Sequence, residues 1–152
     1  MHPILATFLA AMTPIGELRL AIPLALAKYN LEPVSAYVIS VLGNLVPVIF
    51  LLLFLEAVSL FLIDHSKTFE QFFDWLFERT RKRIGHRYEL YGYIALVLFV
   101  AIPLPITGAW TGSVAAYLLG IPFWRAFGLI AIGVSIAGVI VTLASMGVIS
   151  IF

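Results

Sequence analysis

Two of the four apolar segments of this chain have clusters of turn-forming residues near their centres, which limits how either segment can cross a membrane. Residues 90–124 carry no charge, yet they contain the stretch "AIPLPITGAWTG" between Ala101 and Gly112. A spanning helix needs about 20 apolar residues, each adding about 1.5 Å of length. This segment is therefore too long for one untilted span and too short for two spans with a turn. We expect two half-helices joined by a turn inside the membrane, which is a re-entrant hairpin.

The N-terminal segment, residues 1–27, is shorter but has the same kind of interruption, with Thr13–Arg19 reading "TPIGELR". Irregular backbone at membrane depth is tolerated only where protein or a wet cavity covers it. We therefore predict re-entrant hairpins over residues 1–29 and 88–120. The alternative is a single kinked, tilted helix in each place, because prolines also kink spanning helices. The predicted tip residues are Pro14, Gly16 and Pro23 in the first hairpin, and Pro103, Pro105 and Gly112 in the second.

The two remaining apolar segments are ordinary candidate spans, at residues 33–62 and 122–151. The chain is 62% hydrophobic and 11% charged, which is typical of an integral membrane protein and not of a soluble domain. We therefore predict a single all-α, polytopic membrane domain over residues 1–152. The absence of cysteine excludes disulfides and thiolate chemistry, and no basic patch indicates nucleic-acid binding.

Residues 66–84 form an amphipathic linker between the two halves. One predicted helix face is apolar, with a possible capping box at Thr68–Gln71, and the stripe consists of Phe69, Phe72, Phe73, Leu76 and Phe77. We predict a helix lying in the membrane interface, or packed on the protein itself. The linker over residues 64–88 is rich in Lys and Arg, so its face should be cytoplasmic. With two hairpins, both termini lie outside and Arg125 joins the linker face, whereas four full spans would place both termini inside.

The two halves resemble each other weakly, which favours an inverted repeat. Each half is predicted to be one hairpin, which does not change sides, and one span, which does. Pro14 and Pro105 occupy corresponding places, as do Pro33 and Pro122. Interrupted segments in paired, inverted halves point to a substrate site near the membrane midplane.

Glu17 and Arg19 are the ionisable residues deepest within an apolar segment. Charge buried in a membrane is expensive and usually faces a functional cavity. We expect Glu17 to carry a proton and Arg19 to bind substrate; the alternative is a structural ion pair that closes the hairpin. At the second tip, Thr107 is a plausible N-cap for a half-helix whose free N–H groups would attract an anion.

The other candidate residues at the second tip are Gly108, Trp110 and Thr111, which we group with Thr107 as substrate-binding. Gly108 and Gly112 are spaced for close helix contact, an explanation that we favour for Gly112 and leave open for Gly108. Asn44 and Arg125 are expected to support the site, with Asn44 bridging helices through hydrogen bonds. No nucleotide loop, nucleophile elbow, paired-carboxylate pattern or metal-ligand spacing is present, so we expect no enzyme, cofactor or metal.

The stretches "TPIGELRLAIPLALA" and "VAIPLPITGAWTGSVAA", together with "VLGN" at Val41–Asn44, resemble the signatures of the small multi-drug export protein family. That family is similar to the wider DedA (VTT-domain) superfamily. The resemblance implies two opposed re-entrant hairpins and the movement of lipid-linked phosphates or phospholipids between leaflets, with proton coupling. The family name implies drug export instead. DedA proteins carry arginines around the second tip, where this chain has Ala101, Ile102, Ile106 and Thr107. Arg19 is therefore the main candidate cation.

The predicted function is a DedA-like transporter in the plasma or inner membrane, which translocates an anionic or amphiphilic lipid-linked phosphate or phospholipid. Membrane lipid is the expected partner. The chain is expected to form a homodimer, because one copy with so few spans would struggle to enclose a polar path. One alternative is a proton-coupled exporter of cationic drugs with four true spans. The other is a membrane scaffold that transports nothing.

Overall fold

A computed structural model describes residues 2–83 and 86–151 of the chain, and this part is helical with no strand. The predicted all-α class is therefore confirmed. In chain order, the elements are α1 (Pro3–Met12), α2 (Glu17–Pro23), the π-helical turn η1 (Leu24–Lys28), α3 (Pro33–His65), α4 (Lys67–Arg83), α5 (His86–Ala101), α6 (Ala109–Leu118) and α7 (Phe123–Ile151).

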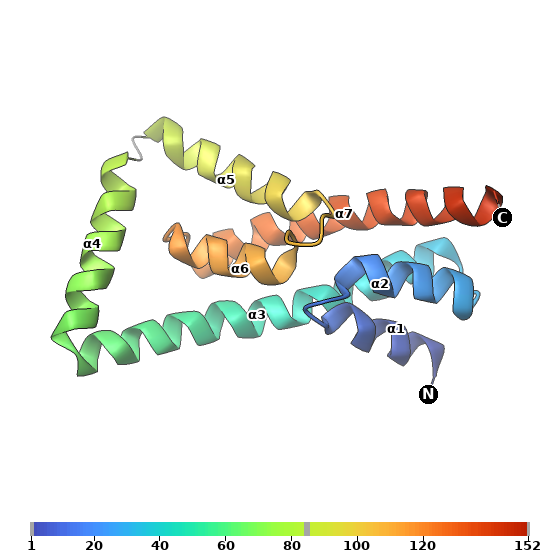
Figure 1. Cartoon of the computed structure of the whole chain (residues 1–152), viewed down its shortest axis with the longest axis horizontal. Coiled ribbons are helices and arrows are strands. Elements are labelled where there is room, and N and C mark those ends of the chain that lie inside the picture. Colours follow the sequence, from blue (N-terminus) through green and yellow to red (C-terminus); the bar gives the residue numbers. More distant parts are fainter. Residues whose placement is uncertain (1, 84–85, 152) are drawn as a thin grey trace.

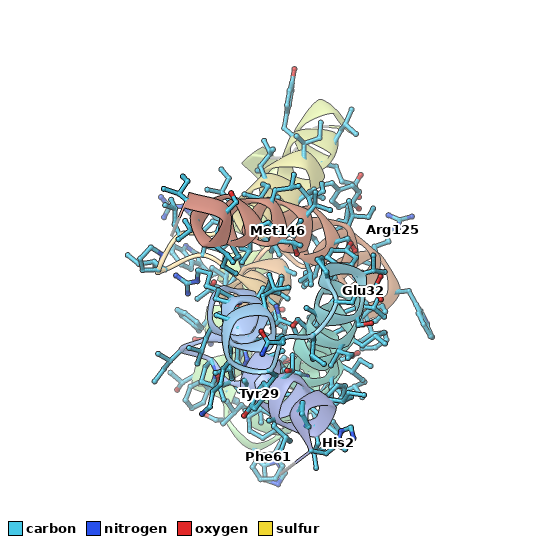
Figure 2. All side chains as sticks on the ribbon, turned by 90° about the vertical axis from the view of Figure 1, so that its right-hand side faces the viewer. His2, Tyr29, Glu32, Phe61, Arg125 and Met146 are labelled. Carbon is cyan, nitrogen blue, oxygen red and sulfur yellow. The ribbon has the colours of Figure 1, made fainter. Side chains whose placement is uncertain are left out.

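The two long helices α3 and α7 are long and apolar enough to cross a membrane. They contain the two predicted spans, although α3 continues beyond residue 62 to His65. The helices run antiparallel and pack against each other along the molecule (Figure 1). Their contact depends on close approach: a Cβ at Gly138 of α7 would lie 2.7 Å from the ring of Tyr37 on α3. Viewed along the molecule, apolar side chains such as Met146 project outwards around the bundle (Figure 2), which suits a lipid environment.

The shorter helices form two hairpins that point at each other. α1 and α2 make one hairpin at the end of the molecule that holds both termini, and α5 and α6 make the other from the opposite end (Figure 1). Their turns, at residues 13–16 and 102–108, meet near the middle of α3 and α7. A buried apolar core surrounds this meeting point, with Ile22, Val48, Val100, Ile130 and Val134 all fully enclosed.

Two predicted tip residues lie inside helices and not in the turns. Pro23 is the last residue of α2, and Gly112 lies within the first turns of α6. Pro23 has no N–H to donate to the preceding turn, and the π-helical turn η1 follows it directly. The Tyr29 N–H then donates to the Leu24 carbonyl five residues earlier, at 3.3 Å, which is the hydrogen bond of a π-turn.

Helix α4 crosses the end of the bundle opposite the termini (Figure 1). It starts at Lys67, so Thr68 lies within the first turn and the predicted capping box does not form. Ser66 serves both helices instead: its N–H donates to Leu62 of α3, and its carbonyl accepts from Glu70 of α4. Phe69, Phe72 and Trp75 are exposed. The side chain of Phe77 and all of residue 84, which the prediction included, lie outside the described part.

Candidate functional site

Glu17 of the first hairpin caps the helix of the second hairpin. It is the first residue of α2 and only 6% of it is exposed. Its Oε2 accepts a hydrogen bond from the Ala109 N–H at 3.3 Å, and its Oε1 accepts one from the Trp110 N–H at 3.2 Å. These N–H groups begin α6, where unpaired donors and the helix dipole favour a negative charge. The carboxylate is therefore bound where a helix attracts an anion.

Gly108 provides the space for this contact. A Cβ at that position would lie 2.1 Å from Glu17 Oε2, which is an impossible distance for any side chain. The explanation left open by the sequence is therefore the approach of the carboxylate, not helix packing. Gly112 has a different neighbour, because a Cβ there would lie 2.4 Å from Val100 of α5. Gly112 thus permits α5 and α6 to pack closely within the second hairpin.

Two further hydrogen bonds join the hairpin tips. The Arg19 guanidinium donates from Nη2 to the Pro105 carbonyl at 3.4 Å. The Trp110 indole N–H donates to the Met12 carbonyl at 3.2 Å. Residues separated by more than half of the chain are therefore tied together by polar contacts, within a mainly apolar bundle.

Thr107 does not cap α6 as predicted. Its hydroxyl donates to the Ile102 carbonyl and accepts from the Leu104 N–H at 3.1 Å, so it closes the connection before the helix. The N-cap is Gly108, which has no side chain to offer. The first N–H groups of α6, which were expected to be free for a substrate anion, are instead occupied by Glu17. Thr111 is exposed, and its hydroxyl donates back to the Gly108 carbonyl at 3.4 Å.

A small, partly open pocket, called the cavity below, lies beside this contact. Glu17 and Arg19 line it from the first hairpin, while Pro103, Thr107 and Gly108 line it from the second. Leu18, Val100, Val134 and Ala137 supply apolar walls. Trp110 and Thr111 are not among the lining residues. The cavity thus brings one carboxylate and one guanidinium together between apolar walls.

Asn44 of α3 also lines the cavity and interacts with the Glu17 carboxylate. It is only 1% exposed, and its Oδ1 has no hydrogen-bond partner among the described residues. The preceding Gly43 lets α1 approach, because a Cβ there would lie 2.6 Å from the Phe8 carbonyl. Asn44 therefore joins α3 to the first residue of α2, as a bridge between helices beside the cavity.

Arg125, which we predicted to support the site, lies elsewhere. It is exposed near the start of α7 and donates to the Tyr93 hydroxyl at 3.1 Å, with Glu89 at 3.7 Å. Its side chain points away from the bundle (Figure 2). Arg125 therefore joins α5 to α7 near the α4 end of the molecule.

Sequence reasoning missed the backbone groups that make the contacts between the tips. These are the N–H of Ala109 and the carbonyls of Met12 and Pro105. A glycine immediately before an apolar helix was the available signal for the first of them. No group of three His, Asp or Glu side chains that could hold a metal occurs within the described residues.

Comparison with known families covers most of this site. The sequence profile of the family described as "Putative small multi-drug export protein" matches residues 17–140, from Glu17 through most of α7. No curated protein and no solved structure matches the chain. The matched region includes the second tip and all the residues that line the pocket, Glu17 and Arg19 among them. The family and the two long apolar helices together indicate a membrane protein. The chain therefore belongs to this family of small multi-drug export proteins.

Proposed function

We propose that this protein is a membrane transporter that moves an amphiphilic substrate with an anionic head group, such as a lipid-linked phosphate or a phospholipid. The observation that carries the proposal is the contact between the two hairpin tips beside the cavity. Glu17 is bound to the α6 N-terminus there, and Arg19 lines the same space. Charges within an apolar membrane domain are expensive, which makes a functional role the default expectation for this pair.

The transport path in this proposal runs past the tips. The hairpins over residues 1–29 and 88–120 enter the membrane from opposite faces, as inverted repeats, and their tips separate the two sides. The basic linker lies in the cytoplasm and both termini lie outside. This arrangement is supported by the termini lying at one end of the bundle and α4 at the other (Figure 1). It is also what similarity to the DedA superfamily implies, and we propose that the functional unit is a dimer.

Proton coupling through Glu17 fits the same contact. An ionised carboxylate accepts two hydrogen bonds from α6, and a charged acceptor makes these bonds strong. A protonated carboxyl group is a weaker acceptor, so protonation loosens the bond between the tips. Arg19 is then the cation that holds the head group while the tips are apart.

Export of cationic drugs is the second candidate, and the family description favours it. In this case Glu17 would exchange a proton for the drug cation. The half-buried Trp110 beside Glu17 would contact the aromatic rings of the drug. Arg19 distinguishes the two candidates, because a guanidinium in a low-dielectric cavity attracts phosphate and repels a cation.

The test compares Arg19 variants in proteoliposomes. Translocation of a fluorescent polyprenyl phosphate and of a quaternary-ammonium dye is measured for the wild type, Arg19→Lys and Arg19→Ala. We expect Arg19→Ala to lower phosphate-lipid translocation by about tenfold or more, with Arg19→Lys between the two, because the guanidinium fork suits phosphate oxygens best.

The matched control is Arg125→Ala, which removes an exposed arginine far from the tips and should leave transport unchanged. Translocation of the dye alone, unchanged or improved in Arg19→Ala, would replace our proposal by drug export. A folded wild type that moves neither compound, and whose Arg19→Ala and Glu17→Gln variants fold equally well, would support the scaffold alternative.

A further inference from the structure

The N-terminus of α6 already holds an anion, and that anion belongs to the chain itself. The two Glu17 oxygens accept from the Ala109 and Trp110 N–H groups, at 3.3 and 3.2 Å. Helix N-termini bind phosphate, sulfate and carboxylate groups in the same manner. Glu17 therefore occupies the place that the anionic group of a ligand would take.

Asn44 gives a second, independent indication that Glu17 can also adopt an arrangement in which it does not hold the N-terminus of α6. Its amide is almost completely buried and lines the same cavity, yet its Oδ1 has no partner among the described residues. A buried acceptor without a donor is unfavourable. The Asn44 side chain already interacts with the Glu17 carboxylate, so a protonated Glu17 would bring a hydroxyl donor to the amide that carries this oxygen.

We propose that the N-terminus of α6 is an oxyanion-binding site, which Glu17 blocks until a ligand replaces it. The ligand's anionic oxygens take the N–H groups of Ala109 and Trp110, with Arg19 as the counter-charge. Glu17 takes up one proton from solvent and donates it in a hydrogen bond to Asn44 Oδ1. One anionic group and one proton therefore enter together. The inference deepens the proposed function and rests on it for the route by which a ligand arrives.

The charged groups on the helices around Glu17 leave Arg19 as its charged neighbour in this exchange. Arg19 is the charged side chain beside it on α2. Helices α1 and α6 contain no charged residue, and Arg125 of α7 is paired with Tyr93 and Glu89 far from the tips. The acidic groups of α3, Glu56 and Asp64, lie in its second half, beyond the tips. Tyr37 of α3 donates to the Ser135 carbonyl at 3.2 Å.

The experiment uses Trp110 as a reporter inside the full-length protein. The substitutions Trp75→Phe and Trp124→Phe remove two exposed tryptophans on α4 and α7, which leaves Trp110 as the remaining one. Its indole N–H bonds the Met12 carbonyl across the tips, so separation of the tips changes its emission. The probe is inorganic sulfate, because its charge stays constant from about pH 8 to about pH 5.

We expect sulfate to bind Glu17→Gln more tightly than the reporter protein itself. If Glu17 occupies the N–H pair about nine-tenths of the time, removing its charge tightens apparent binding about tenfold. Lowering the pH should strengthen binding in the reporter protein by protonating Glu17, whereas Glu17→Gln should show little pH dependence. Asn44→Leu, which removes the acceptor for the proton, should reduce the pH effect.

A backbone substitution locates the site. Ala109 is the first residue of α6, where proline is tolerated, and Ala109→Pro removes one of the two N–H donors. Added to Glu17→Gln, it should abolish the gain in sulfate affinity. If circular dichroism shows that this variant fails to fold, Arg19→Ala in the Glu17→Gln protein replaces it, with the same expected loss.

The same reporter distinguishes a lipid head group from a free anion. Emission is compared in nanodiscs of phosphatidylglycerol and of phosphatidylcholine, with and without sulfate. A Trp110 change in phosphatidylglycerol alone identifies the lipid phosphate as the ligand, and a change only with sulfate identifies a free anion. Either result supports the site.

Sulfate affinity that is equal in the reporter protein and Glu17→Gln, or the absence of any Trp110 response, would overturn the inference. This failure can be told from failure of the proposed function. Sulfate binding without lipid translocation would support the anion site and contradict the transporter proposal. Lipid translocation with no response of Trp110 would support the transporter proposal and contradict the anion site.

Discussion

At the scale of single residues, Glu17 holds an unusual backbone conformation that its hydrogen bonds sustain. Its φ of 45° lies in the left-handed region, which costs a residue with a side chain about 1 kcal/mol. Two bonds from N–H groups to a charged acceptor are worth about 1.5–3 kcal/mol each. The contact with α6 therefore outweighs the backbone strain, and loss of the contact would release the turn.

The first prediction concerns Gly108, whose lack of a side chain admits the Glu17 carboxylate. Gly108→Ala would place a Cβ 2.1 Å from Oε2, so we expect the tip contact to break and stability to fall by about 2–4 kcal/mol. Thermal unfolding of the purified protein measures the loss. Gly92→Ala is the matched control on α5, because a Cβ there meets nothing within 4 Å.

A double substitution tests the cause of that loss. Glu17→Ala removes the side chain with which the new Cβ collides, so Gly108→Ala should then be less destabilising than in the wild type. Only the strain of the Gly108 backbone, with its φ of 157°, should remain. Equal destabilisation in both backgrounds would show that Gly108 is needed for its backbone conformation and not for the carboxylate.

At the scale of elements, small residues decide how closely the helices pack. A Cβ at Gly133 of α7 would lie 2.7 Å from Val100 Cβ and 3.0 Å from the Val97 carbonyl on α5. We predict that Gly133→Ala destabilises the protein by about 1–3 kcal/mol, because the backbone of α5 cannot yield as a flexible side chain would. Gly128→Ala on the same helix meets nothing within 4 Å and should be neutral or slightly stabilising. Similar melting temperatures for both variants would contradict the packing argument.

Helix α4 gives a prediction about the membrane surface. Phe72 and Trp75 are about half exposed, and the Arg79 guanidinium lies 5.1 Å from the centre of the Trp75 ring. An exposed aromatic face with cations beside it is typical of a helix lying in the interface. In a protein with Trp110→Phe and Trp124→Phe, lipids brominated on their acyl chains should quench Trp75 strongly. Quenching by aqueous iodide alone would place α4 in water.

The sequence was sufficient to predict the elements and insufficient to predict the contacts between them. Uncharged length and interrupting prolines predicted α3, α7 and the two hairpins, because bilayer thickness restricts the number of solutions. Pro23 was misplaced because a proline at the end of a helix and a proline in a turn look alike in sequence. Thr107 was misassigned because the Ile102 and Leu104 backbone groups lie nearer to its hydroxyl than the first turn of α6 does. The bond from Glu17 to Ala109 joins residues 92 positions apart, and no local pattern specifies it.

At the scale of the whole molecule, the two possible topologies differ in where they place the termini relative to the basic linker. Both termini lie at one end of the bundle, and α4 lies at the other (Figure 1). If the hairpins are re-entrant, a membrane across the middle places the termini on one side and the basic linker on the opposite side. Four full spans would place the termini and the linker together on the cytoplasmic side, as the excess of Lys and Arg in the linker requires.

The absence of native cysteine makes this difference measurable in intact cells. We predict that single cysteines introduced as His2→Cys and Ser150→Cys react with a membrane-impermeant maleimide, since both positions are exposed at the end of the bundle that we propose lies outside the cell. Lys67→Cys, exposed at the start of α4, should stay protected until the membrane is permeabilised. Protection of all three positions would establish four spans and, with them, the exporter as the better description. Labelling of Lys67→Cys in intact cells, with both terminal positions protected, would invert the orientation but keep the two opposed hairpins, because the termini and the linker would still lie on opposite faces.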